Sequence, residues 1–280
     1  MYAHQNQYQT MKNLKIFCIS LSNNHLEKIK NLNYIPVGLG DENFSKEWLR
    51  DNVGKNISKK NDYYGEYTFH YWLWKNNFID IKDGNWIGFC TYRRFWSNTI
   101  EGIYYEKLKD SILQQTPKEW DNYDSVLVKA LPVNNSKLSK ILKHGKQNIL
   151  KNPSILFNKK NITVKVHFDM YHGYGNLDKA IDLLDNENKN DFRRFVDTEK
   201  AFNPFNMFIC KSQKILREYY DSLFKWLTKC EDIFGFDMDK NYGSIRIYGF
   251  LAERYLSYWF KKNSNSITWP IHFEDITNQN

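Results

Sequence analysis

Residues 85–96 read NWIGFCTYRRFW, an apolar run followed almost at once by two arginines. The run from Trp86 to Cys90 has the length and composition of a buried strand. In open α/β sheets, ligands bind just beyond the carboxyl ends of the strands. Guanidinium groups stay charged and hold phosphate oxygens with paired hydrogen bonds. Arg93 and Arg94 therefore predict a diphosphate site at a sheet edge, and ion pairs with nearby acidic residues are the alternative interpretation.

Segments with strand and helix patterns alternate on both sides of this stretch. Strand patterns cover 14–20, 86–90, 125–130 and 205–210, and helix patterns cover 44–50, 64–77, 104–115, 137–150, 176–188, 212–234 and 244–262. This alternation predicts an α/β, Rossmann-like fold with a mainly parallel sheet flanked by helices. No linker divides the chain, so we expect one domain over residues 11–280, preceded by a flexible tail at 1–10.

Charge is concentrated in one part of the chain. The net charge is +8, and residues 134–168 contain eight lysines and no acidic residue. Such a block favours anions, and an anionic membrane surface is the predicted peripheral contact. A solvated lysine face is the alternative. Nucleic acid is not expected, because the block contains no arginine and the chain has no nucleic-acid-binding motif.

The four cysteines, Cys18, Cys90, Cys210 and Cys230, stand singly and far apart in the sequence. Their spacing predicts neither a zinc site nor a disulfide framework, and they are expected to be core residues. No apolar run reaches the length of a membrane span, and the first ten residues do not form a signal peptide. A cytoplasmic protein is therefore expected, with peripheral contact at the inner membrane face.

Four motifs together resemble a bacterial glycosyltransferase family of capsule and surface-polysaccharide gene clusters, long catalogued as a domain of unknown function. They are D-N-x-G-x-N-I-S-x-K-N at 51–61, Y-R-R at 92–94, N-M-F-I at 206–209 and G-F-L-x-E-R at 249–254. Their order and spacing agree from about residue 34 to 260. Val53 and Thr91 depart from the family pattern, which has Thr and His there. The resemblance implies a GT-A-like fold and transfer from a UDP-sugar, with galactofuranosyl transfer a known activity of such proteins.

Donor-binding residues follow from this resemblance and from side-chain chemistry. Arg93 and Arg94 would hold the diphosphate, with Tyr92 stacked on a ring. Short polar side chains in the loop before the 64–77 helix can reach uracil, ribose or sugar hydroxyls, and we assign this role to Asp51, Asn56, Ser58 and Asn61. Asparagine-rich turns on the surface are the alternative interpretation of that loop.

The acceptor is expected to be a glycan or a polyprenyl-linked glycan, and its hydroxyl needs a base. Glu253 is the first candidate, because it lies in an otherwise apolar helix. An ion pair with Arg246, Arg254 or Lys261 is the alternative role. Glu66 is the second candidate base. His172 and Asp169 lie in a polar, aromatic segment that could line the acceptor site.

A metal requirement is left open by the sequence. No acidic pair follows the 86–90 strand, so the arginines are predicted to neutralise the leaving group, and no metal ligand is assigned. The chain has one D-x-D, at Asp237 and Asp239, after a helix. Mg²⁺ or Mn²⁺ is therefore a possible cofactor. The alternative function is a non-catalytic protein that binds carbohydrate or nucleic acid.

Overall fold

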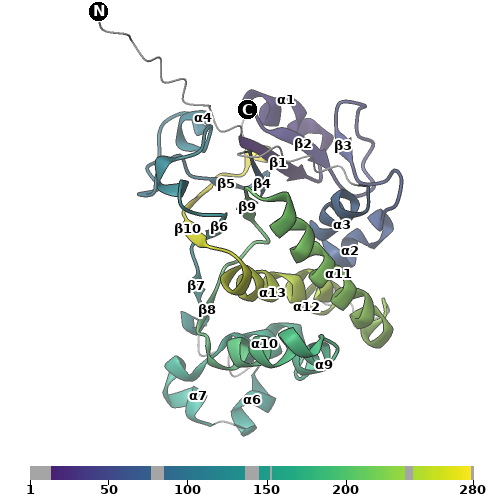
Figure 1. Cartoon of the computed structure of the whole chain (residues 1–280), viewed down its shortest axis with the longest axis vertical. Helices are drawn as coiled ribbons and strands as arrows, with labels where there is room; N and C mark the ends of the chain where they lie inside the picture. The colour runs from purple at the N-terminus through teal and green to yellow at the C-terminus, as the bar shows by residue number, and fades with distance from the viewer. Residues whose placement is uncertain (1–13, 77–84, 136–144, 152, 237–241, 279–280) are drawn as a thin grey trace, which may run out of the picture.

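The computed structural model describes residues 14–76, 85–135, 145–151, 153–236 and 242–278 (Figure 1). One sheet runs through the domain. The order of its main path is β10 (Ser266–Trp269), β6 (Ser125–Val128), β9 (Phe208–Cys210), β4 (Trp86–Thr91), β1 (Leu14–Ser20), β2 (Ile35–Gly38) and β3 (Leu49–Arg50). Only β9 on this path runs against its neighbours. The predicted α/β fold, a single domain with a mostly parallel sheet flanked by helices, is confirmed.

The remaining strands are short. β5 (Arg94–Trp96) folds back on β4 and pairs with β11 (Ile271–Phe273), while β7 (Leu131–Pro132) pairs with β8 (Ala201–Phe202). The helices are α1 (Leu26–Asn31), α2 (Asn61–Tyr64), α3 (Tyr67–Lys75), α4 (Leu108–Ser111), α6 (Lys146–Lys151), α7 (Ser154–Phe157), α8 (Val164–His172), α9 (Asn176–Asp182), α10 (Asn186–Thr198), α11 (Gln213–Phe234), α12 (Tyr242–Ile245) and α13 (Ile247–Asn263).

Alternating side chains of β1 and β4 fill a core on each face of the sheet. Phe17 and Phe89 point into the larger core, which the aromatic residues of α3, α11 and α13 complete. Cys18 and Cys90 point into the smaller core on the opposite face. As expected, all four cysteines are free and buried. Gly88 is needed in β4, because a Cβ there would lie 2.7 Å from Ile209 Cγ1.

Several predicted elements differ from the structure. Residues 44–50 form no helix and end in β3, and the predicted helix at 104–115 is reduced to α4. The strand predicted at 205–210 begins only at Phe208, because Phe205 and Asn206 have positive φ angles of 74° and 55°. The structure adds α1, β2, α8 and β10, which the sequence patterns did not reveal. Residues 1–10 and 136–144 lie outside the described residues, so the predicted tail and most of the predicted helix at 137–150 stay predictions.

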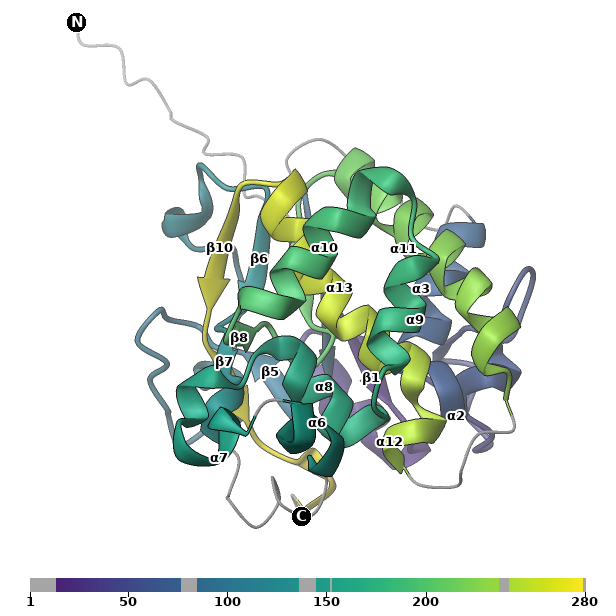
Figure 2. The same cartoon turned by 90° about the horizontal axis from the view of Figure 1, so that it is seen from below.

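Helices α6, α7, α9 and α10 form a cluster at the lower end of the view in Figure 1, and Figure 2 shows the same cluster from below. The cluster is attached through α8, which packs against α6, α9, α10, α12 and α13, and through α10, which packs directly against α13. Among the residues that the structure describes, no helix combines the length and the apolar character needed to cross a bilayer.

Candidate active site

The carboxyl ends of four parallel strands meet at one edge of the sheet. Registers place Gly38 beside both Ser20 and Arg50, and Ile19 beside Thr91. From β1 the chain moves outward to β2 and β3, and β4 then adds on the other side of β1. This reversal makes the β1–β4 junction the topological switch point, where open α/β sheets bind ligands.

A cleft opens at this switch point. Its lining residues come from the ends of β1, β2 and β4 and from two helix junctions: Ile19, Leu21, Leu39, Asn61, Gly65, Glu66, Thr91, Tyr92, Arg93, Arg94 and Arg246. Five of these were assigned from the sequence, namely Asn61, Glu66, Tyr92, Arg93 and Arg94. The free space is about 50 Å³, enough for only one or two waters. A larger ligand therefore requires lining side chains to move.

The two arginines lie on a tight hairpin between β4 and β5. Thr91 pairs with Arg94, so Tyr92 and Arg93 form the two-residue turn over the sheet edge. The Arg93 guanidinium lies 4.8 Å from the Tyr92 ring centre. The Arg94 guanidinium lies 4.4 Å from the ring centre of Phe205. The hairpin thus holds two cations at the switch point, which the strand pattern and the adjacent arginines predicted.

Two interrupted helices supply the opposite wall of the cleft. The predicted helix at 64–77 breaks at Gly65, whose φ is 57°, and the predicted helix at 244–262 breaks at Arg246. The residues at the two breaks face each other, with Arg246 Nη2 3.8 Å from Glu66 Oε2. A Cβ on Gly65 would lie 2.1 Å from Arg246 Nη2 and would displace this guanidinium, and the positive φ of Gly65 itself favours glycine. Arg246 was not assigned to ligand binding from the sequence, because the helix pattern runs through it without interruption.

Asp51 directly follows β3 at the same edge of the sheet. Its side chain is buried, with 1% of the residue exposed, and neither carboxylate oxygen has a hydrogen-bond partner. Burial raises the pKa of this carboxyl, and the nearby Thr68 hydroxyl and Arg50 guanidinium oppose the shift. A buried carboxylate with so few donors is costly, and a ligand with hydroxyl or N–H donors would relieve part of that cost.

Asn56 and Ser58 do not line the cleft. Asn56 Oδ1 accepts hydrogen bonds from the Ser58 N–H at 3.2 Å and the Ser58 hydroxyl at 2.9 Å, so the two residues close a local turn. The preceding loop is fixed at the far end of α3, where Asn76 Oδ1 accepts from the Lys55 N–H. Their predicted contact with a donor is therefore not supported by their positions.

Glu253 is not among the residues that line the cleft, but the charge of Arg94 reaches it. Its Oε1 accepts a 2.6 Å hydrogen bond from the Phe205 N–H, and its Oε2 pairs with the neighbouring Arg254. Burial raises the pKa of the Glu253 carboxyl, Arg254 and the Phe205 N–H lower it, and the charges of Glu66 and Arg94 also reach it. The predicted ion pair with Arg254 is present, and 12% of the Glu253 side chain is still exposed.

The turn that binds Glu253 is conformationally strained. Phe205 and Asn206 both adopt left-handed backbone conformations, which are unfavourable for residues other than glycine and often accompany functional sites. Both Asn206 Oδ1 and Thr91 Oγ1 are buried without a hydrogen-bond partner. Neither was assigned from the sequence, since the signal is a backbone conformation.

Asp169 and His172 are buried away from the cleft, contrary to their predicted place in an acceptor site. Asp169 accepts from Lys165 Nζ at 2.7 Å and from the Gly175 N–H at 3.2 Å. His172 Nδ1 lies 3.1 Å from the Gly243 carbonyl, and burial holds the His172 pKa well below its usual value. Both residues fasten α8 to its neighbours.

A metal site is not formed by the described part of the chain. It contains no group of three or more His, Cys, Asp and Glu side chains placed to hold an ion. The cleft itself offers one carboxylate, Glu66, which faces Arg246. Asp237 and Asp239 lie outside the described residues.

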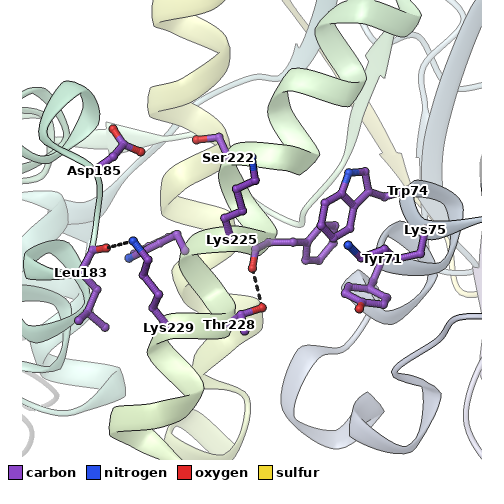
Figure 3. Close-up of a pocket in the computed structure, with 11 residues that line it drawn as sticks. Tyr71, Trp74, Lys75, Leu183, Asp185, Ser222, Lys225, Thr228 and Lys229 are labelled. Carbon is purple, nitrogen blue, oxygen red and sulfur yellow. Dashed lines mark hydrogen bonds between the residues drawn. The ribbon is translucent and has the colours of Figure 1, made fainter.

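A second hollow lies between α3, α11 and the α9–α10 connection (Figure 3). Its aromatic wall is already covered, because Trp74 stacks on Phe224 and Lys75 Nζ lies 3.3 Å from the centre of the Trp74 ring. Its lysines are Lys75, Lys225 and Lys229. The hollow lies away from the strand ends and contains none of the candidate catalytic residues, so we assign no chemistry to it.

Fold and site together define an α/β protein with an arginine-lined cleft at the switch point of its sheet. The sequence belongs to the family described as Domain of unknown function (DUF4422), which it matches over residues 15–264. The expected membership of a family catalogued as a domain of unknown function is therefore confirmed.

The fold is shared with a solved structure, described as the apo structure of WbbM, a bifunctional glycosyltransferase. The two superpose with a TM-score of 0.62 at 19% sequence identity, over 94% of this chain and 45% of the WbbM chain. The present chain thus corresponds to less than half the length of that protein. The search of curated proteins found no match.

Proposed function

We propose that the protein is a glycosyltransferase that moves a sugar from a UDP-sugar to a glycan or lipid-linked glycan in surface-polysaccharide synthesis. The observation that carries this proposal is the cleft at the β1–β4 switch point, with Arg93, Arg94 and Arg246 in its lining. The shared fold with a bifunctional glycosyltransferase supports it. Galactofuranose is the donor sugar that we propose, by family resemblance.

In the proposed reaction, the acceptor oxygen attacks the anomeric carbon and the bond from that carbon to the diphosphate breaks. The arginines stabilise the negative charge that develops on the leaving diphosphate. The acceptor hydroxyl gives its proton to a carboxylate, for which we propose Glu253. We assign contacts with donor hydroxyl and N–H groups to Asn61 at the cleft and to the buried Asp51, and contact with a ring to Tyr92.

Metal removal tests how the leaving group is neutralised. Because cationic side chains line the cleft and only one carboxylate does, we expect EDTA to change the rate of sugar transfer from UDP-galactofuranose by less than about threefold. Calorimetry with UDP in EDTA should still show micromolar binding. Activity that disappears in EDTA and returns with Mg²⁺ or Mn²⁺ would contradict the role given to the arginines. Absence of UDP binding under every condition would favour a non-catalytic protein.

We further propose that the protein works in the cytoplasm at an anionic membrane face, where a polyprenyl-linked acceptor would lie. The α6–α7 region carries Phe157 and Leu150, which are 89% and 81% exposed. Lys146, Lys151 and Lys160 are exposed on the same segment. Apolar side chains surrounded by lysines are typical of surfaces that bind anionic bilayers, where each lysine contributes about 1 kcal/mol.

Vesicle sedimentation tests this membrane contact. We expect the protein to sediment with phosphatidylglycerol-rich vesicles, and to do so less as salt is raised, because salt screens the lysine charges. The double variant Leu150→Ser and Phe157→Ser should lose at least half of the bound fraction, while Ile233→Ser, which changes an exposed side chain of α11, should not. Equal sedimentation with neutral vesicles, or no effect of the double variant, would contradict the proposal.

A further inference from the structure

An aromatic corner lies beside the arginine pair, on the side of Arg94 that faces β11. Phe273 pairs directly with Arg94 across the antiparallel β5–β11 strands, so their side chains share one face. The rings of Phe205 and Phe273 meet at 87° with their centres 5.7 Å apart. The Arg94 guanidinium lies 4.4 Å from the Phe205 centre and 6.0 Å from the Phe273 centre.

Phe273 is open to solvent although it stands next to the candidate active site. It is 56% exposed, whereas its neighbour His272 is buried, with its ring 4.4 Å from that of Tyr104. Adjacent strand residues point to opposite faces, so Tyr104 covers the His272 side and leaves the Phe273 side uncovered. An exposed aromatic ring beside a polar cleft suits a sugar, whose C–H face packs on the ring while its hydroxyls stay solvated.

The corner is connected to the proposed base through one residue. The Phe205 N–H donates a hydrogen bond to the Glu253 carboxylate. Phe205 therefore both holds this carboxylate and supplies, with its ring, one wall of the corner. The buried, unpartnered Asn206 Oδ1 follows directly in the chain. We propose that Phe273 and Phe205 form the acceptor subsite, in which a pyranose ring of the acceptor glycan stacks on Phe273 with a hydroxyl directed toward Glu253. This inference rests on the proposed function.

Saturation-transfer NMR tests the subsite without knowledge of the natural acceptor. The probes are methyl glycosides of glucose, galactose and mannose, with farnesyl phosphate as a lipid probe, all in the presence of UDP. We expect saturation to pass from the protein to the ring C–H protons of at least one glycoside, which gives a saturation-transfer signal for that glycoside. Phe273→Ala should reduce the saturation-transfer signal of that glycoside at least fivefold and change the Kd for UDP by less than threefold. The matched control Tyr105→Ala removes another exposed aromatic side chain. It should change neither the saturation-transfer signal of the glycoside nor the Kd for UDP.

The possible outcomes separate this inference from the function on which it rests. Wild-type protein that binds no UDP would overturn the proposed glycosyltransferase. Protein that binds UDP but no glycoside, or that binds a glycoside equally well after Phe273→Ala, would overturn only the subsite. Transfer to farnesyl phosphate alone, lost in Phe273→Ala, would assign the corner to lipid and overturn its assignment to sugar.

Discussion

Replacing Arg94 with alanine is expected to weaken UDP binding about tenfold to a hundredfold. A hydrogen bond to a charged group contributes about 1.5–3 kcal/mol, and every 1.4 kcal/mol corresponds to a factor of ten in affinity. Arg94 begins β5 at the switch point, and packing against Phe205 holds its guanidinium in the cleft wall. Calorimetric titration with UDP at fixed ionic strength measures the effect.

Two further variants separate the guanidinium fork from simple charge. Arg94→Lys keeps the positive charge but loses the paired hydrogen bonds, so we expect an intermediate loss of affinity. Arg194→Ala removes an exposed arginine on α10 that pairs with Asp191, and it should leave UDP affinity within twofold of the wild type. Equal affinities for the wild type and Arg94→Ala would mean that Arg94 does not contact the diphosphate.

Replacing Glu253 with glutamine is expected to lower turnover at least about 100-fold, because the acceptor hydroxyl loses its general base. The amide retains the size of the carboxylate but cannot accept the proton. Since burial raises the pKa of Glu253, the base becomes protonated at a higher pH than an ordinary glutamate. The acid limb of kcat/KM in the wild type should therefore lie above pH 4.5 and be absent from the residual activity of the variant.

Folding must be checked in the same experiment, because Glu253→Gln leaves the buried Arg254 without its anionic partner. Unchanged UDP affinity in Glu253→Gln would show that the cleft is intact. Glu253→Asp keeps the negative charge, so its turnover should lie between those of the wild type and Glu253→Gln. Glu66→Gln tests the second carboxylate, which faces Arg246, and should lower turnover less than tenfold. A loss of only a few-fold in Glu253→Gln would remove it from the role of base.

The parts of the site that lie next to a strong strand signal could be predicted from the sequence. The apolar run 86–90 forms β4, and the hairpin that follows holds Arg93 and Arg94 in the cleft. Asn56 and Ser58 were assigned to donor binding because their side chains are short and polar. In the structure these polar groups hydrogen-bond each other in a turn. Their composition alone does not distinguish a local turn from a ligand contact.

Long-range contacts explain most of the other differences. His172 is bound by the Gly243 carbonyl, a distant partner that the local sequence does not reveal, whereas Asp169 is held by its close neighbours Lys165 and Gly175. Arg246 enters the cleft because α12 and α13 are separate helices and Gly65, far away in sequence, leaves space for it. The aromatic corner also depends on tertiary pairing, since β11 reaches Arg94 from the end of the chain.

The central claim is that a nucleotide diphosphate binds at the β1–β4 edge, held by guanidinium groups. A crystal structure of the protein with UDP tests it most directly. We predict that both phosphates lie within hydrogen-bond distance of Arg94 and at least one of Arg93 and Arg246, with Arg246 turned away from Gly65 to admit the ligand. UDP bound elsewhere, with all three arginines turned toward protein carboxylates, would contradict the account.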